Sequence, residues 1–416
     1  MAATLLNVYP EASVVEDGRL VIAGCDAIAL AREFGTPAYV VAEDDLRARA
    51  REFTEALRRH HDGPGAVMFA AKAFPATAVL RVFAEEGLHC LVAGGGELYA
   101  ALRAGFPPEH IQLHGNAKGT EELRVALDAG IGGIVVDSFD DLERLEALGA
   151  RQRVLFRVLP EVETNTHAAI ATGHADAKFG LSLASAAKAI ERARAGGRLQ
   201  VAGLHVHIGS QLFDTGPFHA AAEAVAALGS FELYDMGGGL GVPYTRDDPV
   251  LSVDDYVAAK AQALRAVHGE GRTLIVEPGR ALTATSTVTL YTVQTVKHGP
   301  TRTWVAVDGG MSDNLRPMLY GARYEAAIAD RVGEEGEPCA IVGKHCESGD
   351  ELLHDARLPD PRPGDVVVMP TAGAYHHALA NNYNGALRPP VIFCRDGDAR
   401  VVVRRETYED LFRRDA

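Results

Sequence analysis

Polar residues end several of the apolar runs in this chain, in places where they could take part in chemistry. Lys72 follows the run 66–71, His114 closes the run 111–114, and Glu277 follows the run 273–276. An amine, an imidazole and a carboxylate are groups that proteins use for covalent, acid–base and charge-stabilising catalysis. Each residue alone has an ordinary structural explanation, so a functional site is indicated only if several of them share one location.

Other polar residues end neighbouring runs in the same way, namely Glu97, Asn116, Asp137, His205, His207, Asp235 and Arg280. The stretch Gly237–Gly241 (GGGLG) also follows an apolar run, and glycines allow backbone N–H groups to approach an anion. No GxGxxG pattern follows the first run, which argues against a dinucleotide site. The pair His205 and His207 could bind zinc, but no third ligand stands at a suitable spacing, so we expect no metal.

The runs that carry these residues predict an α/β fold, a TIM-like (β/α)8 barrel. Strands that are nearly all apolar and joined by helices form parallel sheets covered on both faces. Eight such strands close a barrel whose chemistry lies at the C-terminal strand ends; an open doubly wound sheet is the alternative. The predicted strands are 66–71, 88–92, 111–114, 133–136, 154–159, 201–208, 231–236 and 273–276.

The pattern changes after residue 281. Residues 285–296 alternate threonine with valine and leucine, the period of a β-strand. Further short strands are predicted at 304–307, 340–342, 365–369, 390–393 and 400–403. We therefore predict three parts. Residues 35–280 form the barrel, residues 281–416 form a C-terminal antiparallel β domain, and the N-terminal segment 1–34 pairs with that β domain.

Composition restricts the kind of partner. The 416 residues carry a formal net charge of −15, which argues against nucleic acid or an anionic membrane as the main partner. We find no transmembrane stretch and no secretory signal. The five cysteines are odd in number and widely spaced, which favours reduced thiols and a cytoplasmic protein.

A set of motifs, taken in order, resembles the fold-type III decarboxylases that depend on pyridoxal phosphate, and most closely their diaminopimelate-specific members. The resemblance covers nearly the whole chain. The motifs are FAAK (69–72), GGGEL (94–98), HGNAK (114–118), THAAIATG…KFG (166–180), GLHVHIGSQ (203–211), DMGGGLG (235–241), EPGR (277–280), DGGMSDNLRPMLY (308–320), CESGD (346–350), GAY (373–375) and NNYNG (381–385).

The resemblance implies pyridoxal 5′-phosphate as cofactor and assigns residues to it. Lys72 would bind the cofactor aldehyde, His207 would stack on its ring, and Glu277 would pair with the pyridine nitrogen. These three residues and Cys346 form the implied catalytic set. Cys346 would be the proton donor, and the alternative is that it is only a structural thiol. Residues implied on the phosphate side are Ser210, Gly237, Gly238, Gly239, Arg280 and Tyr375.

The same resemblance implies the reaction, decarboxylation of meso-diaminopimelate to L-lysine and CO2 by an amino-acid carboxy-lyase. Diamine-forming relatives have an aspartate after the tyrosine of the segment RPMLY, where this chain has Gly321. Planar guanidinium groups suit a distal carboxylate. The implied substrate contacts are Arg280, Arg316, Tyr320, Glu347 and Tyr375. The family forms homodimers in which Cys346 and Glu347 would enter the site of the second subunit.

Two other functions stay open at this stage. Four positions depart from residues frequent in the family: Leu91, Ala117, Leu159 and Lys344. These departures allow the same chemistry on another carboxylate-bearing amino acid, free or linked to a carrier, in a specialised pathway. A catalytically silent regulator with this fold is the second alternative, but the retained Lys72, Glu277 and Cys346 argue against it. The signatures of alanine racemases, which share the architecture, are absent.

Overall fold

The computed structural model describes residues 7–160 and 178–416, which form two compact units. One unit comprises Ala48–Gly241 and Val250–Ala281, and the other comprises Met1–Arg47, Val242–Pro249 and Leu282–Ala416. Each unit is described by itself. The predicted motif residues 166–177 lie outside the described residues.

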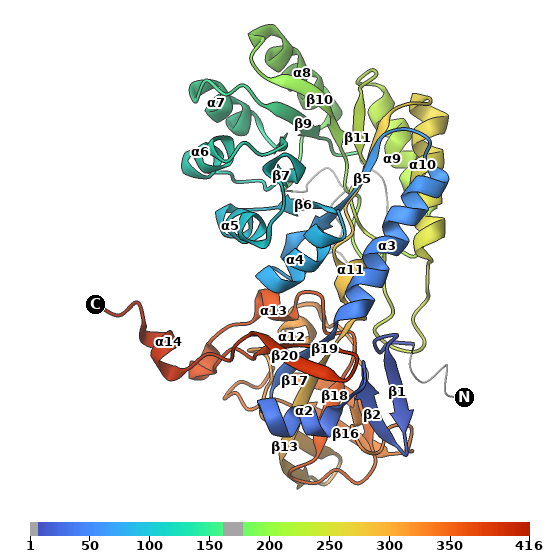
Figure 1. Ribbon diagram of the computed structural model, residues 1–416, viewed down its shortest axis with the longest axis vertical. Helices are drawn as coiled ribbons and strands as arrows, with labels where there is room; N and C mark the ends of the chain where they lie inside the picture. Colours follow the sequence, from blue (N-terminus) through green and yellow to red (C-terminus); the bar gives the residue numbers. More distant parts are fainter. Residues whose placement is uncertain (1–6, 161–177) are drawn as a thin grey trace. The chain divides into compact units, whose positions relative to one another are not determined.

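The first unit is a closed barrel of eight parallel strands, which confirms the predicted fold and excludes the open sheet. The strands pair in the order β10-β11-β12-β5-β6-β7-β8-β9. Figure 1 shows them enclosed by the helices that join them. Their bounds are β5 (Gly65–Ala70), β6 (His89–Val92), β7 (Ile111–Leu113), β8 (Gly133–Val136), β9 (Arg153–Arg157), β10 (Gln200–His205), β11 (Leu233–Asp235) and β12 (Thr273–Val276).

The helices around the barrel are amphipathic and pack one face on the strands. In α4, for example, Val79, Leu80, Val82 and Phe83 are buried. Serine side chains cap α7, α8 and α10, where each accepts a hydrogen bond from a backbone N–H of the first turn. The helices are α3 (Glu43–His60), α4 (Thr77–Glu85), α5 (Gly95–Ala104), α6 (Thr120–Asp128), α7 (Phe139–Ala147), α8 (Leu183–Gly196), α9 (Gly216–Ala226), α10 (Val253–His268) and α11 (Arg280–Thr283).

The inside of the barrel is filled by side chains and is not a channel. The inward-facing residues form one buried apolar cluster of Met68, Ala70, Leu91, Val135, Leu155, Leu233 and Ile275. A packed interior leaves the strand ends as the place where polar side chains can gather. The C-terminal ends of the strands are therefore where the predicted site residues should be sought.

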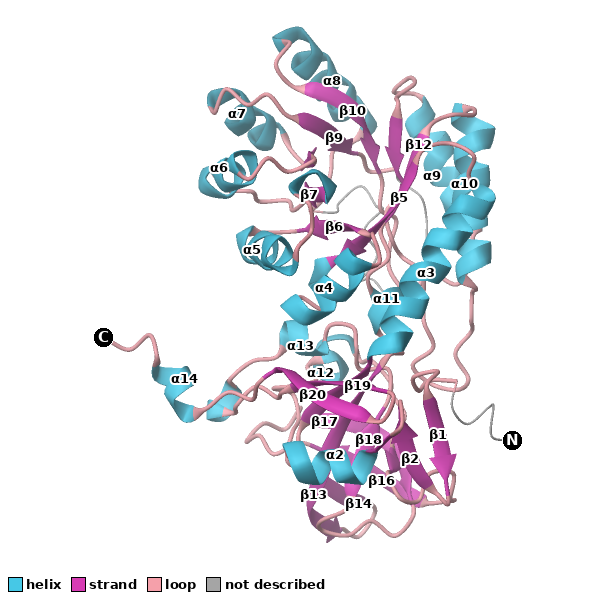
Figure 2. Cartoon of the chain, viewed as in Figure 1, coloured by secondary structure: helices cyan, strands magenta, loops and turns pink. Residues whose placement is uncertain are grey.

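The second unit is built on a nine-stranded sheet with the main order β17-β16-β14-β13-β4-β19-β20. Figure 2 shows several of its strands in magenta beside the short helix α2. Its strands are β4 (Ala38–Ala42), β13 (Thr287–His298), β14 (Thr303–Val307), β15 (Ala327–Ile328), β16 (Glu337–Val342), β17 (Glu351–Leu358), β18 (Val366–Met369), β19 (Val391–Arg395) and β20 (Asp398–Val403). Short helices accompany the sheet: α2 (Ala27–Phe34), α12 (Arg316–Tyr320), α13 (His376–Leu379) and α14 (Tyr408–Phe412).

This sheet is mixed, where the sequence pattern predicted an antiparallel one. β14 pairs in parallel with β16, and β4 pairs in parallel with β19, while the remaining pairs are antiparallel. Parallel neighbours need a long connection between them. Both parallel pairs have such a connection. In the sequence, α12 and β15 come between β14 and β16, and all the barrel strands come between β4 and β19.

Residues near the N-terminus belong with this second unit. The strand β4 pairs with β13 and β19, so the structure places Ala38–Ala42 in the mixed sheet, whereas the sequence placed residues 35–280 in the barrel. The strands β1 (Ser13–Glu16), β2 (Arg19–Ile22) and β3 (Cys25–Asp26) form a small sheet of their own. Leu20 and Ile22 pack in the same apolar core as Val288 and Leu290 of β13.

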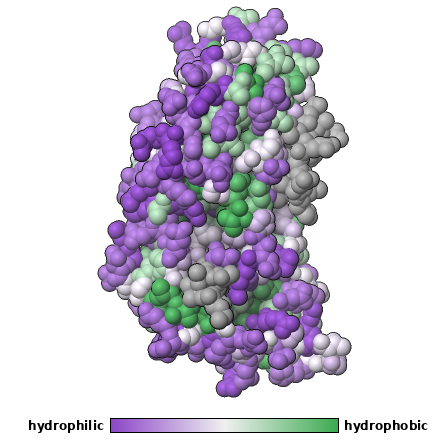
Figure 3. All heavy atoms as spheres, turned by 90° about the vertical axis from the view of Figure 1, so that its right-hand side faces the viewer, coloured by the Kyte–Doolittle hydropathy of each residue, from purple (hydrophilic) through white to green (hydrophobic). Residues whose placement is uncertain are grey.

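The hydropathy of the surface and the state of the cysteines agree with the charged composition and the reduced thiols expected from the sequence. The face in Figure 3 is mostly hydrophilic, with smaller hydrophobic patches between. None of the helices in the part of the chain described here is long and apolar enough to cross a membrane. All five cysteines are unpaired thiols; Cys346 is exposed and the other four are buried.

Candidate active site

Lys72 stands at the C-terminal end of the first barrel strand. It lies in a short 3-10 turn, Ala71–Ala73, that directly follows β5, and Lys72 is exposed to solvent. Its charge acts on two neighbours: it lowers the pKa of His207 in addition to the larger effect of burial, and it opposes the effect of burial on Glu97. The amine is therefore presented at the barrel rim, close to the imidazole that the sequence assigned to the same site.

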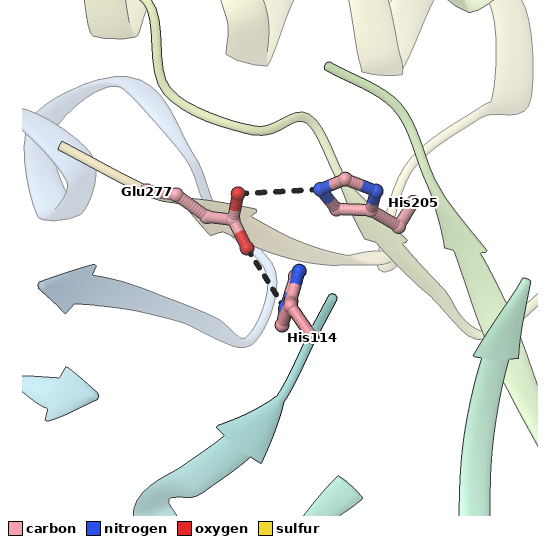
Figure 4. A group of neighbouring side chains, drawn as sticks. All are labelled: His114, His205 and Glu277. Carbon is pink, nitrogen blue, oxygen red and sulfur yellow. Dashed lines mark hydrogen bonds and ion pairs between the residues drawn. The ribbon is translucent and has the colours of Figure 1, made fainter. Parts of the chain in front are cut away.

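Glu277, at the end of β12, is held by two histidines from other strands (Figure 4). The Nε2 atom of His205 lies 3.2 Å from its Oε2, and the Nε2 atom of His114 lies 3.2 Å from its Oε1. All three residues are buried, and the two imidazole rings meet edge to face with centroids 4.9 Å apart. The carboxylate is thus fixed in position by side chains from β10 and from the loop after β7.

Burial and the neighbouring side chains together determine the protonation of this cluster. It lowers the pKa values of His114, His205 and His207, so these imidazoles are neutral and can donate one N–H each. Burial raises the pKa of Asp235 well above its usual value, and the neighbouring Glu277 raises it further. Burial also acts to raise the pKa of Glu277, but His114, His205 and Asp235 outweigh it and hold that pKa well below its usual value. Of the two carboxyl groups, Glu277 therefore carries the negative charge.

The same three side chains have a spacing that would suit a metal ion. One possible ligand atom from each of His114, His205 and Glu277 lies within 4.8 Å of the others. The sequence considered His205 together with His207 as a possible zinc pair. In the structure His205 contacts Glu277 instead, and the Nδ1 atom of His207 accepts a hydrogen bond from the N–H of Gly238. The hydrogen bond between His205 and Glu277 and the short contact between His114 and Glu277 account for the arrangement of the three side chains.

The glycine stretch after β11 lies beside this cluster. Gly237 has φ +65°, a conformation that favours glycine, and a Cβ on Gly238 would lie 2.3 Å from the backbone oxygen of Glu277. Across the loop, the Nη2 atom of Arg280 donates to Oγ of Ser210 at 3.0 Å. The structure thus brings together Lys72, His207, Ser210, Glu277, Arg280 and Gly237–Gly239 at one end of the barrel.

Two further buried ion pairs at the strand ends were missed by the sequence analysis. Lys118 lies 2.7 Å from Asp141, and Arg157, at the end of β9, lies 3.7 Å from Asp137 and over the ring of Phe179. A signal was present in each case: Lys118 belongs to HGNAK, and Arg157 is a charge inside an apolar run. Burial lowers the pKa of Arg157, and its neighbours Asp137, Glu277 and Asp235 oppose this.

The remaining predicted residues lie in the second unit. Arg316 is buried: its guanidinium stacks over Tyr244 at 4.5 Å and donates to the hydroxyl of Tyr324. Tyr320, at the end of α12, is partly buried. Tyr375 has φ +68° at the start of α13.

Cys346 and Glu347 are both exposed, and the N–H of Cys346 donates to Oδ1 of Asn384 at 3.0 Å. The roles assigned to these residues and to Arg316, Tyr320 and Tyr375 stay predictions.

Comparison with known proteins decides the family. Residues 43–284 match the family described as "Pyridoxal-dependent decarboxylase, pyridoxal binding domain". A diaminopimelate decarboxylase of Actinosynnema pretiosum subsp. auranticum is 46% identical over 98% of this chain and 95% of its own length. The chain belongs to the pyridoxal-dependent decarboxylase family. This confirms the resemblance inferred from the motifs, and it confirms the predicted enzyme class of amino-acid decarboxylases.

Other members of the family are similar over almost their whole length. The diaminopimelate decarboxylase of Bacillus subtilis is 44% identical over 96% of each chain. A crystal structure of diaminopimelate decarboxylase from M. jannaschii in complex with L-lysine has a TM-score of 0.91, 35% identity and 98% coverage of both chains. The corresponding enzyme of Helicobacter pylori, also with L-lysine, has a TM-score of 0.86 and 31% identity over 92% of this chain and 98% of its own.

Proposed function

We propose that this decarboxylase binds pyridoxal 5′-phosphate at the C-terminal end of its barrel and converts meso-diaminopimelate to L-lysine and CO2. The observation that supports this most strongly is the shared location of Lys72, His207, Glu277 and the Arg280–Ser210 pair at the barrel rim. The names of relatives at 41–46% identity support the substrate. The L-lysine in two related structures is the product of the proposed reaction.

The chemistry of these side chains fits the cofactor. An aldehyde needs an accessible amine, and Lys72 is exposed at the rim. A phosphate needs hydrogen-bond donors, which the side chains of Arg280 and Ser210 supply beside the glycine loop. A protonated ring nitrogen needs a negative charge beside it, and Glu277 is the carboxyl group of the rim cluster that stays ionised.

Each residue of the chain then has a separate task. Pyridoxal phosphate, when bound, supplies a conjugated ring that accepts the electron pair left on the substrate when CO2 departs. Glu277 keeps its charge because His205 is hydrogen-bonded to its Oε2 and the imidazole of His114 lies 3.2 Å from its Oε1. His207 is neutral, so its ring can lie against a positively charged heterocycle without repulsion. Lys72 would hold the aldehyde of the cofactor through its exposed amine, which the amine of the substrate could replace.

The proton that replaces CO2 must come from an acid group near the substrate carbon. We assign this task to Cys346, whose exposed thiol is the only one of the five outside a buried environment. Because Cys346 and Glu347 are exposed, they are accessible to a second copy of the chain. In the proposed homodimer they complete the site of the partner, where Glu347 binds the distal amine of the substrate and Arg280, Arg316, Tyr320 and Tyr375 serve its carboxylate end.

A substrate panel tests the proposed reaction. The purified chain is loaded with pyridoxal phosphate, and CO2 release is measured with meso-diaminopimelate, L-lysine, L-ornithine and L-arginine. We expect release from meso-diaminopimelate to exceed that from the others by at least about 10³-fold, because the latter lack the distal carboxylate and leave cationic groups unpaired. No release from meso-diaminopimelate, together with release from another amino acid, would contradict the proposed substrate.

A further inference from the structure

Lys260 is a fully buried lysine that lies directly behind the glycine loop. It is on α10, with Tyr256 one turn earlier, and its side chain has no exposure to solvent. Its Nζ atom donates to the backbone oxygens of Met236, Gly237 and Gly238 at 2.8, 2.6 and 3.0 Å. A buried ammonium group is costly unless all of its N–H groups are paired. Nζ also donates to the hydroxyl of Tyr256, so four oxygens surround the three N–H groups of the ammonium.

The groups packed around Lys260 come from four elements. The hydroxyl of Tyr256 lies 2.6 Å from Nζ, and the rings of Tyr256 and Phe218 (α9) lie 4.4 and 4.8 Å from it. The carboxyl groups of Asp235, at the end of β11, and of Glu277, at the end of β12, lie nearby, and Glu277 carries the negative charge. Burial lowers the pKa of Lys260 to about 7, and the two carboxyl groups oppose this shift.

These contacts determine which way the peptide groups of the loop point. In a trans peptide the C=O and the following N–H point in opposite directions. The three carbonyl groups that converge on Lys260 are followed by the N–H groups of Gly237, Gly238 and Gly239, which are therefore directed away from the lysine. Two of them have partners at the candidate site: Gly237 donates to Asp235 at 3.0 Å, and Gly238 donates to Nδ1 of His207 at 3.3 Å.

An anion on the far side of the loop would meet two favourable effects. Two of the three N–H groups are held by Asp235 and His207, and the peptide dipoles of the loop, whose N–H ends point toward the site, attract an anion. A positive charge directly behind the same peptides attracts an anion, and the attraction is strong because the region is buried and has a low dielectric constant. No residue of the predicted site supplies this second effect from behind the loop, and the sequence motifs do not include Lys260.

We propose that Lys260 is a positioning residue for the phosphate of the cofactor: it holds the peptides of residues 236–239 with their N–H groups toward the site and places a positive charge behind them. This inference rests on the proposed function, because it takes pyridoxal phosphate as the ligand of the loop. Lys260 would act through the backbone of the glycine loop and would not contact the cofactor itself.

The test compares two ligands that differ only in the phosphate. The chain is freed of cofactor, and the dissociation constants of pyridoxal 5′-phosphate and of pyridoxal are measured by visible absorbance. In Lys260→Met we expect the affinity for pyridoxal phosphate to fall at least about tenfold, the loss of one charge-assisted interaction. The affinity for pyridoxal should change by less than about twofold, because pyridoxal carries no phosphate.

Two controls separate the charge from general damage to the fold. Lys188→Met replaces an exposed lysine on α8, and Tyr256→Phe removes a hydroxyl from the same buried cluster but leaves the ammonium and its three carbonyl partners. Both should leave the two affinities within about twofold of the wild type. A loss in Tyr256→Phe equal to that in Lys260→Met would overturn the inference, since the effect would not depend on the ammonium.

The outcomes also distinguish this inference from the proposed function. If the wild type binds pyridoxal as tightly as pyridoxal phosphate, the proposed phosphate site itself is wrong. If the wild type prefers pyridoxal phosphate and Lys260→Met keeps that preference, only the role of Lys260 is wrong. Lys260→Gln, which keeps two N–H donors without the charge, replaces the methionine variant if the latter does not fold. Failure of both variants to fold would make Lys260 a requirement for folding and overturn the inference.

Discussion

At the scale of single residues, the site depends on how the charge of Glu277 is maintained in a buried position. A carboxylate taken out of water tends to bind a proton, and Asp235 does so here. Glu277 keeps its charge because the imidazoles of His114 and His205 each lie 3.2 Å from one of its oxygens. Two adjacent acidic groups thus have different protonation states, which are set by their neighbours.

Replacing Glu277 by glutamine keeps the shape of the side chain and removes its charge. We expect kcat for CO2 release to fall on the order of 10²-fold or more, because the ring nitrogen loses the charge that keeps it protonated. The affinity for the cofactor should change much less, since Lys72 and the phosphate contacts remain. Steady-state kinetics and cofactor titration measure the two effects; an unchanged kcat would show that Glu277 is not the partner of the ring nitrogen.

At the scale of elements, the glycine loop after β11 is closely packed against the end of β12. An added Cβ on Gly238 would lie 2.3 Å from the backbone oxygen of Glu277, whereas one on Gly96 in α5 would meet nothing within 4 Å. Gly238→Ala should therefore cost roughly 1–3 kcal/mol of unfolding free energy and weaken cofactor binding, because backbone atoms must move.

Gly96→Ala is the matched control, and it should leave Tm and cofactor affinity nearly unchanged. Thermal unfolding and cofactor titration of both variants test this expectation. Equal effects in the two variants would contradict the close contact between the loop and β12.

In the second unit, a buried carboxyl group makes stability depend on pH. Burial raises the pKa of Asp313 to about 7, although Tyr291 and the N–H of Gly310 donate to it. The folded state then holds a proton that the unfolded state loses near pH 4. The contribution of this group to the unfolding free energy is therefore largest below pH 4 and decreases as pH rises toward 7.

Asp313→Asn tests this pH dependence, because an amide resembles the protonated carboxyl and does not titrate. The Tm of the variant relative to the wild type should increase between pH 5 and pH 8. A Tm difference that stays constant over this range would mean that Asp313 is ionised throughout.

The elements also show what the sequence could predict. All eight barrel strands were predicted close to their observed bounds, because strands that are buried on both faces are continuous apolar runs. β17 was missed because its exposed positions carry His354, Asp355 and Arg357, which interrupt the apolar pattern. β4 is apolar and fully buried, but its partners β13 and β19 are hundreds of residues away in the chain, and local patterns carry no information on such pairing.

The residues of the candidate site could also be predicted only in part. Residues within motifs, such as Lys72 and Glu277, could be located from the sequence. Lys260 could not, because a single lysine among the alanines of α10 resembles an exposed helical residue. Its function follows only from the three backbone oxygens that it contacts.

At the scale of the whole molecule, the proposed homodimer makes each site depend on two chains. Lys72→Ala and Cys346→Ala should each be nearly inactive when pure. When the two are mixed in equal amounts and allowed to exchange subunits, half of the dimers are mixed, and each mixed dimer has one intact site. Activity should then return to about one quarter of the wild-type value, by the statistics of a symmetric dimer. No recovery after confirmed exchange would place Lys72 and Cys346 in the site of one and the same chain.

The proposed function requires that the amine of Lys72 binds the aldehyde of pyridoxal phosphate at the barrel rim, and chemical trapping can detect this bond. Borohydride reduction makes an aldehyde–lysine link permanent, and peptide mass spectrometry then identifies the modified lysine. We expect the label on the peptide that contains Lys72 and no label at that site in Lys72→Ala. A label on another lysine of the wild-type chain, such as Lys118 or Lys260, would contradict it.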